Sequence, residues 1–186
     1  MDKLLETPPF PILIWDDFCW RGSLQLKSWA GFQSRRGPYN SVDSPAGSDG
    51  TASLTVFTSN DQPVPPTVEQ AAAIRFLFEH EEQIRDSILR AVLDAYPEIR
   101  EDYEDAGEEM PDISVPDELM PHLGLSFVHC LRVSRSDMVY LGFELGCSWE
   151  PEHGLGVMTH GTRVIEVGGA DTSFLEWIAD TDAAEN

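Results

Sequence analysis

The sequence predicts an α+β fold with a mainly antiparallel sheet, a central helical pair and a short C-terminal helix. Strand-like segments lie before and after one helical region, whereas parallel crossovers require a regular alternation of strands and helices. In the second half they follow one another at hairpin spacing, which is typical of antiparallel pairing. A chain of 186 residues has the length of one domain, which we place at 1–186.

Three strand-like segments open the chain. Residues 10–15 follow a proline-rich entry, and residues 20–29 and 52–58 alternate between apolar and polar side chains, as half-buried strands do. Residues 31–50 between them are rich in Ser, Gly, Pro and Asn. This composition predicts a mobile loop.

The helical region begins at a capping box formed by Thr67 and Gln70. Apolar residues then repeat at spacings of three and four as far as Tyr96, which predicts an apolar stripe along each helix. Like charges crowd residues 79–82 and favour a break into two helices. Pro97 is expected to end or kink the second helix.

The second half contains two expected hairpins, a single helical turn at 116–121 and a final helix capped by Asp171 or Thr172. An acidic tail, residues 179–186, is expected to fray. The strands of the two hairpins are expected at residues 125–133, 138–145, 156–159 and 163–167.

The composition favours a cytoplasmic protein. No apolar run approaches the roughly 18 residues of a membrane span, and the N-terminus lacks the features of a signal peptide. Cys19, Cys130 and Cys147 form no disulfide framework, so free thiols in a reducing compartment are the simplest interpretation.

The net charge of −21 limits the class of partner. A field of this sign repels nucleic acid and anionic membranes and speeds encounter with cationic proteins. Four basic residues near the N-terminus, Arg21, Lys27, Arg35 and Arg36, are too few to support nucleic-acid binding. Solubility alone, or a salt-adapted host, is the alternative explanation of the charge.

Residues 101–118 contain nine acidic side chains and no basic one. A block of like charge is either a solvated loop or an interaction surface, and the sequence leaves both open. The acidic side chains are Glu101, Asp102, Glu104, Asp105, Glu108, Glu109, Asp112, Asp117 and Glu118.

Residues 143–171 concentrate side chains that are competent for chemistry, and they form either a site or a structural corner. Cys, His and carboxylate groups can bind zinc, but no established zinc spacing is present. We therefore expect no metal and no cofactor. Cys147 and Trp149 are expected to pack inward, Glu150 and Glu152 to cover a turn, and the His153 ring to bond a backbone carbonyl or carboxylate.

Nucleophilic catalysis by cysteine is not favoured. His129 and Cys130 are neighbours in a strand, so their side chains point to opposite faces. Cys147 could approach His153 or His160, but the negative field opposes the lowered thiol pKa that catalysis needs. We expect no enzyme and assign no catalytic residue. A metal-assisted hydrolase centred on Cys147, Glu152 and His153 is the open alternative.

Residues 147–157, C-S-W-E-P-E-H-G-L-G-V, and residues 164–171, V-I-E-V-G-G-A-D, carry a family resemblance. The chain resembles a bacterial uncharacterised domain family with a C-terminal C-x-W-x-x-E-H-G-x-G-V pattern. Residues 65–96, where P-T-x-x-Q opens the helical region, are similar as well. The likeness covers about two-thirds of the chain and leaves out the loop 31–50 and the acidic segment 101–118.

Several such domains occur near loci for polymorphic toxins and contact-dependent competition. The resemblance thus implies a cytoplasmic immunity protein, a non-catalytic inhibitor of one cognate toxin. The negative charge favours a toxin that is basic, for example a nuclease whose cleft an acidic inhibitor can occupy in place of phosphate groups. An adaptor or chaperone for a basic secreted protein is a further alternative. On this interpretation the partner-binding residues are Glu101, Asp102, Glu104, Asp105, Glu108, Glu109 and Asp112.

Overall fold

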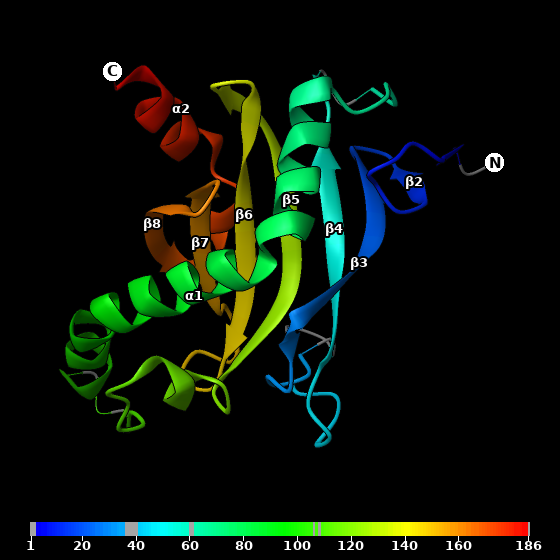
Figure 1. Ribbon diagram of the computed structural model, residues 1–186. Helices are drawn as coiled ribbons and strands as arrows, with labels where there is room; N and C mark the ends of the chain where they lie inside the picture. The colour runs from blue at the N-terminus through cyan, green and yellow to red at the C-terminus, as the bar shows by residue number, and fades with distance from the viewer. Residues whose placement is uncertain (1–2, 36–40, 60–61, 106, 108, 186) are drawn as a thin grey trace.

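The computed structural model describes residues 3–35, 41–59, 62–105, 107 and 109–185. It is an α+β fold in which one eight-stranded sheet carries a long helix on one face and a short helix on the other (Figure 1). The strands lie in chain order across the sheet: β1 (Leu4–Leu5), β2 (Leu13–Asp16), β3 (Cys19–Ala30), β4 (Asp49–Phe57), β5 (Leu123–Arg135), β6 (Met138–Cys147), β7 (Leu155–His160) and β8 (Arg163–Gly169).

Every pair of neighbouring strands is antiparallel except β4 and β5, which run parallel. The exception arises because helix α1 (Val68–Asp105) connects these two strands, and a crossover helix returns the chain in the same direction. The expected hairpins are confirmed: β5 pairs with β6, and β7 with β8. The predicted mainly antiparallel sheet is therefore correct.

Helix α1 begins as predicted and bends as predicted. The Thr67 backbone amide donates to Gln70 Oε1 at 3.0 Å, and the Gln70 amide donates to Thr67 Oγ1 at 3.2 Å, which is a reciprocal capping box. His80 has non-helical dihedral angles and divides α1 into two segments at a kink. The kink is visible in Figure 1, so the expected helical pair is present.

Pro97 does not end the helix, because α1 continues through it to Asp105 without a second non-helical residue. Proline lacks an amide donor and costs a helix interior about 3 kcal/mol. Tertiary contacts of Tyr96 and Tyr103 hold the segment in place. As a result, residues 101–105 of the acidic segment are helical.

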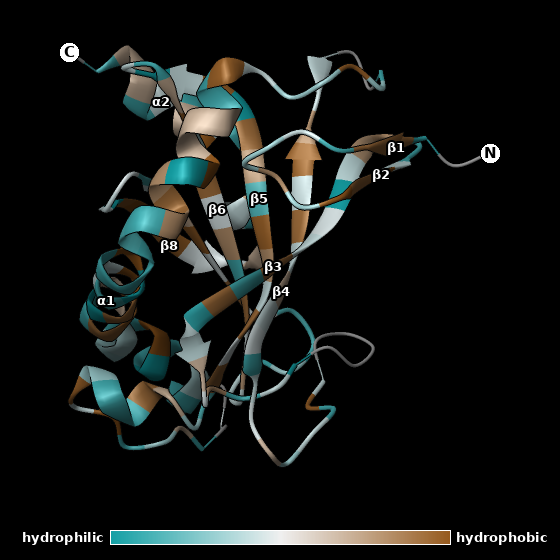
Figure 2. Cartoon of the chain, turned by 45° about the vertical axis from the view of Figure 1, so that its right-hand side comes forward, coloured by the Kyte–Doolittle hydropathy of each residue, from teal (hydrophilic) through white to brown (hydrophobic). Residues whose placement is uncertain are grey.

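Two apolar layers cover the two faces of the sheet. The larger core lies between the sheet and α1, whose outer side carries hydrophilic residues (Figure 2). The smaller core contains Leu131, Tyr140 and Met158 and lies under α2 (Glu176–Ala184). Side chains that alternate along the strands supply both layers, so β5, β6 and β7 are buried on both faces over most of their length.

The C-terminal segment differs from the sequence-based prediction. Residues 179–184, expected to fray, belong to α2, where Ala179 and Asp182 are buried. Asp182 accepts hydrogen bonds from Arg135, Arg163 and Tyr140, and these donors hold the helix end. Residues 170–173 form a separate 3-10 helix, η4, rather than a cap of α2.

The predicted loop 31–50 contains ordered contacts. Phe32, Ser34 and Arg35 are buried, Ser34 forms a bridge with Ser44, and Asp49 and Gly50 already belong to β4. Residues 36–40, including Arg36, lie outside the described residues. A short 3-10 helix, η3 (Pro116–Leu119), occupies the expected helical turn. Among the described residues, no helix is long and apolar enough to cross a membrane.

Candidate functional site

The motif at residues 147–157 forms the corner between β6 and β7. Cys147 ends β6 and is buried, and its thiol donates to the Glu150 carbonyl at 3.7 Å. Trp149 packs edge-on against Tyr96 of α1, with ring centroids 5.3 Å apart. The expectation that Cys147 and Trp149 pack inward is confirmed. This part of the motif is therefore structural.

Gly154 allows the corner to turn tightly. Its φ is +71°, and a Cβ at this position would lie 2.5 Å from the Leu145 carbonyl oxygen. Side chains other than glycine rarely adopt this conformation, and the space is already filled by backbone. The glycine in the E-H-G portion of the motif is accounted for by the geometry of the turn.

Glu150 connects the corner to the end of α1. Its carboxylate accepts hydrogen bonds from the Tyr103 hydroxyl and from the His153 backbone amide, the latter at 3.3 Å. It also lies 3.0 Å from Nδ1 of the His153 ring. The Tyr103 hydrogen bond, followed by the His153 contacts, lowers the pKa of Glu150. Burial, followed by the bond to Glu150, raises the pKa of Tyr103. The predicted bond of His153 to a carboxylate is confirmed.

Glu101, Asp102, Asp105 and Glu109 form the surface that the corner supports. The first three are exposed on the last turns of α1, and Glu109 is exposed just beyond it. Within the part of the chain that the structure describes, none of the four forms an ion pair. We call these four residues the acidic surface.

Two of the predicted partner-binding residues already share one cation. Arg100 donates to Glu104 at 2.7 Å and to Asp112 at 3.1 Å. The spacing of four between Arg100 and Glu104 is a sequence signal from which the Arg100–Glu104 pair could have been predicted. Glu108 lies outside the described residues.

The last two acidic residues of the segment differ in role. Glu118 accepts hydrogen bonds from the backbone amides of Ser114 at 2.8 Å and Val115 at 3.2 Å, and these bonds lower its pKa. Glu118 therefore shapes the loop that enters η3. Asp117 is exposed in η3 and forms no ion pair with any described residue.

The acidic surface stands at the electrostatically unfavourable end of α1. The last turn contains no basic residue, although the negative end of a helix dipole favours cations. Each carboxylate there costs a few tenths of a kcal/mol, up to about 1 kcal/mol. An arrangement that lowers stability without a local compensating contact is a mark of a functional surface.

The alternative metal site is not assembled among the residues that the structure describes. Cys147 is buried, whereas the His153 side chain is 77% exposed and Glu152 is exposed. Burial raises the pKa of Cys147 to about 12. No group of three or more His, Cys, Asp or Glu side chains in the described ranges could hold a metal ion.

His129 and Cys130 face opposite sides of β5, as predicted. Cys130 belongs to the core under α1, and its burial raises its pKa. The His129 ring stacks on Phe127 and lies 3.2 Å from Glu144. The thiol and the imidazole therefore have no means of acting as a pair.

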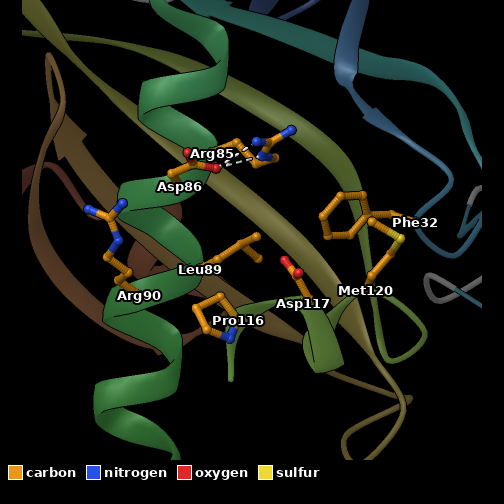
Figure 3. Close-up of a pocket in the computed structure, with 8 residues that line it drawn as sticks. All are labelled: Phe32, Arg85, Asp86, Leu89, Arg90, Pro116, Asp117 and Met120. Carbon is orange, nitrogen blue, oxygen red and sulfur yellow. Dashed lines mark hydrogen bonds and ion pairs between the residues drawn. The ribbon is translucent and has the colours of Figure 1, made fainter. Parts of the chain in front are cut away.

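A hollow between α1 and η3, shown in Figure 3, was not predicted from the sequence. Phe32, Leu89 and Met120 line it. These residues come from three segments that are distant in the chain, and no local pattern joins them. They meet in the folded chain, where η3 packs against α1 and Phe32 joins the same core.

Comparison with protein families identifies the family of this chain. No curated protein and no solved structure shows significant similarity to it. A family model described as a domain of unknown function (DUF6985) matches residues 21–175, a range that includes most of the sheet, all of α1 and the corner at 147–157. The chain belongs to this family.

Proposed function

We propose that this chain is a cytoplasmic, non-catalytic immunity-type protein that binds and neutralises a basic bacterial toxin through its acidic surface. The observation that carries the proposal is the exposure of Glu101, Asp102 and Asp105 on the last turns of a supported helix and of Glu109 just beyond it. None of the four is engaged in an ion pair within the described ranges.

The support beneath the acidic surface favours binding. Trp149 packs against Tyr96, and Glu150 accepts a hydrogen bond from the Tyr103 hydroxyl. These contacts hold α1 both before and after Pro97 in the chain. A surface held in place before binding loses little conformational entropy when a partner docks. This rigidity is what an inhibitor of high affinity requires.

The charge favours a basic partner. The chain carries a net charge of −21, and complementary fields raise association rates and reject partners of the same sign. Toxins that cleave nucleic acid present basic clefts to phosphate groups. A row of carboxylates can occupy such a cleft in place of the phosphates, and a nuclease is therefore the favoured type of toxin.

The buried thiols support a non-catalytic role. Burial raises the pKa of Cys147 to about 12 and raises that of Cys130 as well. Thiols with such a pKa remain protonated at neutral pH and are poor nucleophiles. The exposed His153 side chain bonds to Glu150, so its role is to stabilise the corner between β6 and β7.

The test is rescue of growth. A partner captured on the immobilised protein is identified, purified and expressed alone or with the chain in a bacterial host. We expect the partner to be basic and to arrest growth, and the wild-type chain to restore it. The quadruple variant E101K, D102K, D105K and E109K is expected to lose the rescue.

The matched control reverses four other exposed carboxylates, with the same change in net charge. These are Glu79, Glu82, Glu166 and Asp180. This control variant is expected to keep most of the rescue. Rescue by the first variant as strong as by the wild type would contradict the proposal. So would turnover of a substrate that is lost in His153→Ala.

A further inference from the structure

We propose that the open face of strands β1–β3 binds a second copy of this chain and forms a two-fold symmetric dimer. The inference goes beyond the proposed function and does not depend on it. Three properties of this face carry the inference: its exposed apolar side chains, its balanced charge and its capacity to match itself.

The apolar layer under α2 does not extend to the N-terminal strands. Helix α2 packs against β5 and β8, and Figure 1 shows α2 and β2 towards opposite ends of the sheet. On the N-terminal strands, the side chains that point away from α1 are exposed instead. In β3 these are Arg21, Ser23, Gln25 and Lys27.

Apolar side chains gather on this open face. Leu4 and Ile14 are directly paired across β1 and β2, so both project from the same side of the sheet. Ile12 lies two residues before Ile14 and therefore points to that side as well. Leu4 is 60% exposed, Ile12 57% and Ile14 47%. Single exposed apolar residues are ordinary, whereas a group of them on one face marks an interaction site.

The charge of this region selects the partner. Residues 3–29 contain three basic and three acidic side chains, so their net charge is zero in a chain whose net charge is −21. A basic protein is drawn towards the acidic surface, and Figure 1 shows the end of α1 far from β2. A second copy is itself strongly acidic, and it meets the least repulsion where the charge is balanced.

The face is also complementary to itself, as a two-fold interface requires because the same residues lie on both sides. Arg21 Nε lies 2.5 Å from Asp16 Oδ2, next to Ile14, so each copy presents one charge of each sign. A hollow of about 630 Å³ is lined by Ile12, Ile14 and Arg21. The Phe18 ring, 69% exposed, lies in the turn between β2 and β3. Each copy thus offers both a hollow and an exposed ring to the other.

The contact is made by faces rather than by edges. Strand β1 ends the sheet but has only two residues, and an edge this short is a poor template for an added strand. Two sheets that pack face to face bury the side chains between them. The dimer should therefore bury Leu4, Ile12 and Ile14.

The test is the molecular mass of the full chain, measured by sedimentation velocity over a range of concentrations. We expect a monomer–dimer equilibrium with a dissociation constant in the micromolar range. Because the copies repel through their net charge, raising the salt from about 50 to 300 mM should lower this constant severalfold. Salt should weaken capture of a basic partner, so the two interactions respond to salt in opposite directions.

The double variant Ile12→Glu, Ile14→Glu should raise the dissociation constant at least about thirtyfold. The matched control, Val68→Glu with Val115→Glu, adds the same charge at two other exposed β-branched residues and should change it by about threefold or less. Dilution of the wild-type protein, observed by NMR of isoleucine methyl groups, needs no variant. The Ile12 and Ile14 signals should shift on dilution, and the Ile99 signal on α1 should not.

A monomer mass at every concentration would overturn the inference, as would equal losses in the two double variants. Dilution shifts at Ile99 without shifts at Ile12 and Ile14 would place the contact elsewhere and overturn it too. Shifts of Ile12 and Ile14 that require the captured partner would assign this face to that partner instead. A dimer without growth rescue would contradict the proposed function alone, and rescue by a monomer would contradict only the dimer.

Discussion

The ends of α1 and α2 use their carboxylates in opposite ways. On α2, Asp182 is buried and accepts hydrogen bonds from Tyr140, Arg135 and Arg163. On the last turns of α1, Glu101, Asp102 and Asp105 face solvent, and the described residues offer them no ion pair. The first arrangement stabilises the fold, and the second leaves charge free for a partner.

The difference lies in where the basic residues are placed. Arg135 and Arg163 come from β5 and β8 and converge on α2, whereas the end of α1 is held by the rings of Tyr96 and Trp149 and the Tyr103 hydroxyl. Aromatic and hydroxyl contacts support a helix without neutralising its acidic face. The molecule can therefore fix the end of α1 and keep its negative field.

The largest expected effect is on the support of α1. Trp149→Ala removes a buried ring that packs on Tyr96 and should lower the free energy of unfolding by about 3–5 kcal/mol. Trp177→Ala in α2 is the matched control, because Trp177 is 58% exposed. Urea denaturation checks both variants. Equal losses would show that Trp149 does not support the fold.

Asp182→Asn should lower the free energy of unfolding by about 3 kcal/mol, because it leaves two guanidinium groups without their buried partner. Asp180→Asn, at an exposed position of the same helix, should change it by less than about 0.5 kcal/mol. Thermal and urea unfolding measure both. A loss below about 1 kcal/mol for Asp182→Asn would remove the contrast between the two helix ends.

The hydrogen bonds of the Asp182 carboxylate also make the free energy of unfolding depend on pH. Hydrogen bonds from Arg163, followed by Tyr140 and Arg135, hold the pKa of Asp182 well below its usual range. A carboxylate whose pKa is lowered by folding stabilises the fold at pH values above its pKa in the unfolded chain, which is about 3.9 for Asp. This contribution is lost as pH falls through the folded pKa. Unfolding free energies measured between neutral and acidic pH should fall less steeply in Asp182→Asn, and an unchanged slope would refute the assignment.

Tyr103→Phe should produce a smaller and local effect. It removes the hydroxyl group that donates a hydrogen bond to Glu150 and should lower the free energy of unfolding by about 1 kcal/mol. Amide hydrogen exchange should quicken at residues 98–105 and remain unchanged in β5 and β6. Tyr140→Phe is the comparison, because the Tyr140 hydroxyl donates a hydrogen bond to Asp182 of α2. In this variant amide hydrogen exchange should quicken in α2 instead. Uniform acceleration in both variants would contradict a local role.

The smallest expected effect has the opposite sign. Asp105→Lys places a cation at the negative end of the α1 dipole and should raise stability by about 0.3–1 kcal/mol. Denaturation at low salt measures the gain, and added salt should reduce it. A loss of stability would mean that Asp105 contributes to the fold rather than to a partner surface.

The sequence predicted the strand at residues 125–133 from its alternating side chains, although most of this strand is buried on both faces because helices cover both sides of the sheet. It predicted the kink because Glu79, Glu81 and Glu82 crowd His80. It left open whether Pro97 ends or kinks the helix, and the helix does not end there because contacts with a corner some fifty residues away hold the next turns in place. Tyr96 and Tyr103 lie seven apart on one helix face, and this spacing was the signal that the helix continues.

The candidate site was predicted only as a block of charge. Which carboxylates remain free depends on pairs that form in space, such as Arg100 with Asp112 and Glu118 with the Ser114 amide. The hollow beside η3 has no local signature, because its walls come from distant segments. Composition therefore indicates the kind of partner, whereas the available groups become visible only in the folded chain.

The most direct test of the central claim is the association rate constant of the captured partner, measured against ionic strength for the wild type and the two quadruple charge-reversal variants. We expect the wild-type rate to fall roughly tenfold or more between about 50 and 300 mM salt. Reversal of Glu101, Asp102, Asp105 and Glu109 should slow association much more than reversal of the four control residues. A rate indifferent to salt, or equal losses in both variants, would contradict capture by the acidic surface.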